Sequence, residues 1–166
     1  PIRRWQFLLG KYLGILLMMA TIVGLLFGVS AGLRTYQGGE LSVQFLSAFV
    51  LIFFQLVIIA AIALLFASFS SPLLSGLLSV SLFLLGHLHT QFELVRDYFE
   101  THLLRSLIDA TIFLLPNLSS MNVATEVVRD IPLPPSYLLH AVWYATSYAA
   151  LVLLLAMVIF SRRDLI

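Results

Sequence analysis

The fold is decided by one stretch, residues 41–92, which reads LSVQFLSAFVLIFFQLVIIAAIALLFASFSSPLLSGLLSVSLFLLGHLHTQF. It contains 52 consecutive residues without Asp, Glu, Lys or Arg. A single straight helix of that length would extend about 78 Å at about 1.5 Å per residue. The hydrocarbon core of a bilayer is only about 30 Å thick and is crossed by about 20 apolar residues. We therefore predict that the stretch folds back on itself in lipid.

The point of reversal is predicted by the polar cluster SFSSP at residues 68–72. Serine clusters mark turns, and proline is favoured as the first residue of a helix. We expect a helical hairpin with limbs at residues 41–67 and 72–88.

The composition of the whole chain supports a membrane location. Of its 166 residues, 61% are hydrophobic and 10% are charged, against about 25% charged in a typical soluble domain. The absence of cysteine excludes disulfides and thiolate metal sites. Because the chain starts at Pro1 without Met, we expect further sequence before it.

Two more charge-free segments, residues 12–33 and 136–160, are each long enough to cross a bilayer. With the hairpin they predict an all-α, polytopic bundle of four transmembrane helices in a single domain, residues 1–166. The segment between the third and fourth spans is residues 93–135. Residues 93–115 carry charged and apolar side chains at helical spacing, whereas residues 117–135 are loop-like, with a possible short helix around residues 123–128. Arg96 with Glu100, and Arg105 with Asp109, are spaced for ion pairs on one amphipathic helix. We expect this segment to lie outside the membrane or to re-enter its outer leaflet.

Small residues recur every four positions in the first span, at Ala20, Gly24, Gly28 and Gly32. Such residues share a helix face and let another helix approach closely. We predict that Gly24, Gly28 and Gly32 pack against another helix, within this chain or across a dimer.

Polar side chains inside the hairpin are few. Gln44 and Gln55 are predicted to face other helices, because an unpaired amide in lipid is costly. His87 and His89 are interpreted as interfacial residues. A metal site there is disfavoured because residues two apart on a helix point away from each other. No cofactor or metal is expected.

The N-terminal segment PIRRWQFLLGK, residues 1–11, combines cations with aromatic residues. Arg3, Arg4, Trp5 and Phe7 suit a membrane interface, where cations meet headgroups and tryptophan lies at the boundary. On composition alone, a basic anchor for the helix that follows is an equally good interpretation.

Four short stretches, in order along the chain, resemble ABC-2 type transporter permeases. The first is PIRRWQFLLGKYLG, with Pro1, Arg4, Phe7, Gly10 and Lys11 at matching positions. The others are the serine-rich turn FSSPLLSGLL, LLPNLSSMN at residues 114–122, and the exit FSRRDL. The family pattern has six spans, so this chain resembles its C-terminal four.

The resemblance implies a permease subunit of an ATP-driven transporter. Residues 1–11 would be the coupling segment that docks on a cytoplasmic ABC ATPase subunit through Arg3, Arg4, Trp5 and Phe7. A second permease subunit, identical or different, would complete the complex. The chain contains no G-x-x-x-x-G-K-[ST] phosphate loop, so it is not itself the ATPase, and no enzymatic activity of its own is expected. The apolar spans suit export of a lipid, glycolipid or hydrophobic compound, and nothing indicates nucleic-acid binding.

Two alternatives remain open. The chain could be a non-transport scaffold or accessory subunit of a larger membrane complex, with the N-terminal segment only an anchor. It could instead be an intramembrane enzyme, although its spans offer few polar groups beyond Gln44, Gln55, hydroxyls and histidines.

Charge distribution predicts the orientation. The two ends carry five cations, and the opposite side carries more acids than cations. By the positive-inside rule, we expect both ends of the chain to be cytoplasmic. The membrane we expect is a prokaryotic inner (plasma) membrane.

Since the chain has no cysteine, single cysteines can report this orientation directly. In intact cells an impermeant thiol reagent should label Gly38→Cys, which lies in a polar loop, and should not label Ser161→Cys. The reverse pattern would overturn the orientation.

Overall fold

The computed structural model describes residues 3–88, 91, 94, 96, 106, 108–109, 115–123 and 134–162. Its regular elements in these ranges are helical, with no strand among them, which confirms the all-α prediction. They are α1 (Arg4–Tyr36), α2 (Val43–Ala67), α3 (Pro72–His87), the short 3-10 helix η1 (Ser119–Met121) and α7 (Pro135–Arg162).

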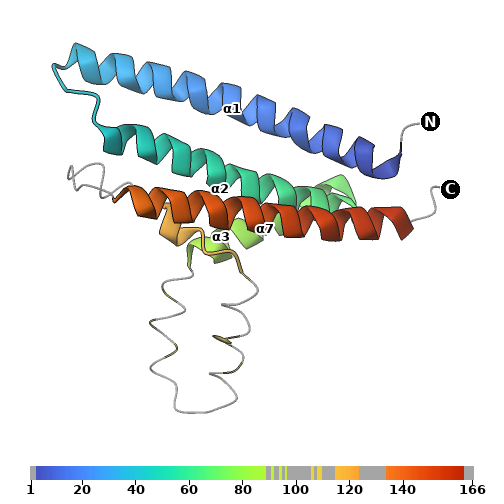
Figure 1. Cartoon of the computed structure of the whole chain (residues 1–166). Helices are drawn as coiled ribbons and strands as arrows, with labels where there is room; N and C mark the ends of the chain where they lie inside the picture. Colours follow the sequence, from blue (N-terminus) through green and yellow to red (C-terminus); the bar gives the residue numbers. More distant parts are fainter. Residues whose placement is uncertain are drawn as a thin grey trace.

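The three long helices α1, α2 and α7 lie side by side (Figure 1). α2 returns antiparallel to α1, and α7 runs in the same direction as α2, so the N- and C-terminal ends lie at the same end of the bundle (Figure 1). Each of the three is long and apolar enough to cross a membrane. α3 has 16 residues and is a shorter apolar helix, about 24 Å long at about 1.5 Å per residue.

The predicted hairpin turn is confirmed. α2 ends at Ala67 and α3 begins at Pro72, which occupies its first turn. The Ser71 hydroxyl accepts a hydrogen bond from the backbone N–H of Leu74 and caps the helix. This cap satisfies a donor that would otherwise have no partner at the start of a helix.

The core lies mainly between α2 and α7, which make the most extensive contact in the bundle. Alanines are buried on both helices, at Ala60 and Ala61 of α2 and at Ala145, Ala149 and Ala156 of α7. Small side chains allow two backbones to approach closely, and in lipid this packing is a main driving force for helix association.

α1 joins this core through a narrow stripe that includes Leu8, Tyr12 and Val23. The Tyr12 hydroxyl donates a hydrogen bond to the carbonyl oxygen of Val57, at 3.1 Å, and ties α1 to α2. α1 also begins at Arg4 and continues unbroken through the predicted span. The proposed coupling segment is therefore the first part of a membrane helix.

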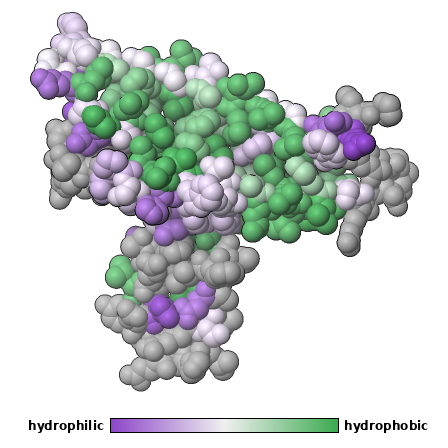
Figure 2. Space-filling model, viewed as in Figure 1, coloured by the Kyte–Doolittle hydropathy of each residue, from purple (hydrophilic) through white to green (hydrophobic). Residues whose placement is uncertain are grey.

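The visible face of the molecule is largely hydrophobic along the helices, and hydrophilic residues gather toward their ends (Figure 2). Large apolar side chains such as Leu17, Leu25 and Leu154 are more than half exposed. A soluble protein rarely exposes so continuous an apolar surface, whereas lipid covers it without cost.

The predicted single amphipathic helix after the hairpin is wrong in one respect. Nε of Arg96 lies 2.8 Å from Oδ1 of Asp109 in an ion pair. One straight helix would hold residues thirteen apart at about 20 Å, so Arg96 and Asp109 do not belong to one straight helix. The other ion-pair partners predicted here, Glu100 and Arg105, lie outside the described residues, as do His89 and most of residues 93–135.

The predicted glycine ridge makes no close contact within the described part of the chain. A Cβ atom added at Gly24, Gly28 or Gly32 would meet nothing within 4 Å. Packing of this face against a second chain stays a prediction.

Gly86, in contrast, marks a close approach between α3 and the segment at residues 115–123. A Cβ atom on Gly86 would lie 2.9 Å from the carbonyl oxygen of Pro116 and 2.8 Å from a methyl carbon of Leu118. Leu118 is fully buried. Only glycine lets this irregular segment rest on α3.

We predict that Gly86→Ala destabilises the protein by about 1–3 kcal/mol, the usual cost of overpacking. Gly76→Ala on the same helix is the matched control, because its Cβ would meet nothing within 4 Å. Each purified variant is unfolded in mixed micelles by an increasing fraction of a denaturing detergent, which measures its free energy of unfolding. Equal stability of the two variants would contradict the close approach.

Candidate functional site

The polar groups of the hairpin meet inside the bundle. Gln55 of α2 is 9% exposed, and its Nε2 lies 2.9 Å from Nε2 of His87 at the end of α3. The prediction that Gln55 faces another helix is confirmed. The interpretation of His87 as an interfacial residue is wrong, because its ring turns into the bundle and pairs with an amide there.

The second ring nitrogen of His87 determines its tautomer. Nδ1 lies 3.1 Å from the carbonyl oxygen of Phe83, which can only accept a hydrogen bond. Nδ1 therefore carries the proton, and Nε2 accepts from the Gln55 amide. In this arrangement both ring nitrogens have a hydrogen-bond partner.

The contact also places the end of α3 in the bundle. Gln55 lies twelve residues from each end of α2 (Val43–Ala67), so its hydrogen bond holds His87 beside the middle of that helix. α3 thus ends about halfway along α2. A helix that stops at membrane depth requires its backbone to be buried in protein, because lipid offers no hydrogen bonds.

The residues that cover this end of α3 form an irregular turn that is held by several hydrogen bonds. The backbone N–H of Asn117 donates to the hydroxyl oxygen of Tyr144 on α7, at 3.0 Å. The Asn117 side-chain oxygen accepts from the Ser119 hydroxyl at 2.9 Å and from the Ser120 N–H at 3.1 Å. The Tyr137 hydroxyl donates to the carbonyl oxygen of Ser120.

Together Gln55, His87 and the turn at residues 115–123 form what we call the polar junction. It joins α2, α3 and α7. It contains no carboxylate and no permanent cation. Among the described residues, no group of three or more His, Asp or Glu side chains could hold a metal ion. The junction is suited to holding interrupted helices together.

The second candidate region is the N-terminal end of α1. Trp5 and Phe7 are 45% and 59% exposed, while Leu8 is buried. The Phe7 ring stacks on Phe160 of α7, with centroids 6.5 Å apart. The Gln6 side chain accepts from the backbone N–H of Arg3, at 3.0 Å, and caps the helix.

The predicted docking residues differ in their contacts within the bundle. Phe7 holds the end of α1 against the end of α7, and Trp5 keeps about half of its surface available to a partner or to lipid. Arg3 is exposed. The Arg4 side chain lies outside the described residues.

The sequence alone did not reveal Asn117 and Tyr144 as parts of the junction. In the sequence, the stretch LLPNLSSMN stands out only for its resemblance, and its serines and asparagine are the available signal. Tyr144 gave no separate signal, because tyrosine is common near the ends of membrane helices.

Comparisons with protein-family models, with curated proteins and with solved structures find no match for this chain.

We predict that Gln55→Leu destabilises the bundle by about 1 kcal/mol, because it leaves Nε2 of His87 without its donor. The double variant Gln55→Leu/His87→Leu should cost less than the sum of the single changes, since the two groups act as a pair. Denaturant unfolding in micelles measures all three.

Gln44→Leu on the same helix is the control, because Gln44 makes no such pair with His87. Additive costs in the double-mutant cycle would show that the Gln55–His87 bond contributes nothing.

Proposed function

We propose that this chain is a membrane permease subunit of an ATP-driven ABC-2 type transporter and that it works with a separate cytoplasmic ATPase subunit. The observation that carries the proposal is the exposed aromatic and basic end of α1, at Arg3, Trp5 and Phe7. It coincides with the stretch whose residues resemble the family's coupling segment. Exposed aromatic and arginine residues are the types that most often dominate protein interfaces.

The continuity of α1 supports this role. Because α1 runs unbroken from Arg4 to Tyr36, a force applied at Trp5 is transmitted to Tyr12 and its hydrogen bond with Val57 on α2. The stacked pair Phe7 and Phe160 extends the same movement to α7. Alternating access in transporters works largely by such rigid-body motion of helices.

The placement of the termini is compatible with the proposed topology. Both ends lie at one end of the bundle (Figure 1), as an even number of crossings requires. We propose that α3 enters the membrane from the cytoplasmic side and belongs to the third of four crossings. The segment leading to α7 would then lie outside or re-enter the outer leaflet.

The polar junction fits a moving bundle. Interrupted helices at membrane depth occur where transporters change conformation, and their polar groups must find partners in each state. In this proposal the Gln55–His87 bond and the Asn117–Tyr144 bond stabilise one of those states. A second permease subunit completes the path, and the transported compound is a lipid, glycolipid or hydrophobic molecule.

The test is purification of the tagged chain from membranes of its natural source in mild detergent. We expect a co-purifying subunit with a phosphate-binding loop and ATPase activity. A photoreactive amino acid in place of Trp5 should cross-link to that subunit. One in place of Trp143 should not, because Trp143 is 76% exposed but lies in the first half of α7, away from the end of the bundle that carries Trp5.

Substitutions then separate docking from lipid anchoring. Trp5→Ala and Arg4→Glu should reduce ATPase association at least several-fold, and an acid-to-Lys change in the partner should restore the Arg4→Glu variant. Trp143→Ala is the matched control. Recovery of a stable complex without any ATPase would instead favour the scaffold or accessory subunit, and wild-type association by both variants would refute the coupling role.

A further inference from the structure

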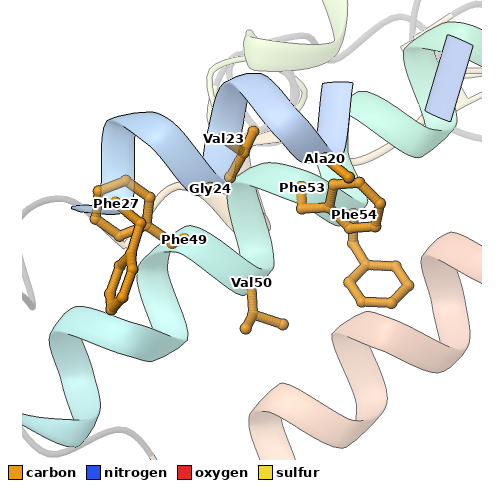
Figure 3. Close-up of a pocket in the computed structure, with 8 residues that line it drawn as sticks. All are labelled: Ala20, Val23, Gly24, Phe27, Phe49, Val50, Phe53 and Phe54. Carbon is orange, nitrogen blue, oxygen red and sulfur yellow. The ribbon is translucent and has the colours of Figure 1, made fainter. Parts of the chain in front are cut away.

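A groove lies between α1 and α2 on their apolar surface. It has a volume of about 330 Å³ and is lined by Ala20, Val23, Gly24 and Phe27 of α1 and by phenylalanines and a valine of α2. In Figure 3, Phe27 and Phe49 lie at one end, and Ala20, Phe53 and Phe54 lie at the other. The open space at Gly24, where a Cβ would meet nothing within 4 Å, is part of it.

One end of the groove leads to a positive charge. Phe27 contacts Phe45, with ring centroids 5.6 Å apart. The guanidinium of Arg34 lies over that same Phe45 ring, 5.3 Å from its centroid. Ala20, Phe27 and Arg34 are spaced seven residues apart, close to two helical turns, so they share one face of α1. The groove and the cation thus form one continuous stripe.

The dimensions favour a slender occupant. Ala20 and Arg34 are about 21 Å apart along the helix axis, somewhat more than one leaflet of a core about 30 Å thick. A single hydrocarbon chain fits such a space.

The charge determines the headgroup. Arginine binds phosphate oxygens through paired N–H donors, and basic sites beside membrane helices bind anionic lipid headgroups. The side chain of Arg34 folds against Gly39, where a Cβ would lie 2.9 Å from its Cγ. This contact holds the Arg34 side chain at the C-terminal end of α1.

We propose that this groove binds one phospholipid with an anionic headgroup, whose acyl chain lies between α1 and α2 and whose phosphate meets Arg34. The site needs no ATPase partner, so it stands or falls independently of the transport proposal. Its occupant comes from the bilayer.

The experiment uses tryptophan quenching by brominated lipids in the full chain. In a Trp5→Phe/Trp143→Phe background, Phe53→Trp places a reporter in the groove and Leu25→Trp places one on an exposed face of α1. The protein is reconstituted in vesicles of phosphatidylcholine with increasing fractions of dibrominated phosphatidylglycerol or dibrominated phosphatidylcholine. Val50→Trp, on the same wall of the groove, serves if Phe53→Trp does not fold.

We expect the groove reporter to be half-quenched at a several-fold lower fraction of brominated phosphatidylglycerol than of brominated phosphatidylcholine. Arg34→Gln should abolish the difference and Arg34→Lys should keep part of it, while the Leu25 reporter should respond equally to both lipids. Equal quenching of the groove reporter by both lipids would overturn the headgroup preference. Weak quenching by both, with normal quenching at Leu25, would show that a second protein chain fills the groove.

Discussion

The structure depends on one constraint, which is that polar groups at membrane depth must find partners inside the protein. α3 stops beside the middle of α2, where lipid offers neither donors nor acceptors. Gln55, His87 and the Phe83 carbonyl satisfy one another at this point. The turn at residues 115–123 then covers the end of α3 and satisfies its own backbone through Asn117 and Tyr144. Without these bonds, a helix that ends there would be unstable.

Among the elements that the structure describes, α2 is the one that all others contact. It packs on α1, α3 and α7, and it carries the most apolar sequence of the chain. Its buried alanines allow α7 to approach closely, and its Val57 carbonyl receives the Tyr12 hydroxyl of α1. Because hydrophobic burial gives little driving force between helices in lipid, close packing and these few hydrogen bonds hold the bundle together.

α1 differs from the other long helices because it buries only a narrow stripe. That leaves a groove against α2, an unpacked glycine face and an exposed aromatic end. These features suit a helix with further partners. We propose an ATPase at its end and a phospholipid in its groove. A second chain on its glycines stays a prediction, and at Gly24 it competes with the phospholipid.

Hydropathy and turn chemistry in the sequence by themselves determined that the chain is helical, that it is suited to a membrane, and that a hairpin turns at residues 68–72. These properties follow from local composition. An apolar helix satisfies the hydrogen bonds of its own backbone, and a proline such as Pro72 is tolerated in the first turn of a helix but not in its interior. The buried position of Gln55 also followed from the cost of an unpaired amide. The partners of His87 and Arg96 were missed because Gln55 and Asp109 are distant from them in the chain.

Only the tertiary structure decided where α3 ends, which small residues pack and what surrounds Arg34. From the sequence alone, the glycines of α1 and the alanines of α2 and α7 look equally suited to helix packing. Which of them meet depends on helix rotation, and rotation is set by contacts among side chains far apart in the chain. Gly86 shows the same limit, because its need for a bare Cα arises from Pro116 and Leu118, some thirty residues later.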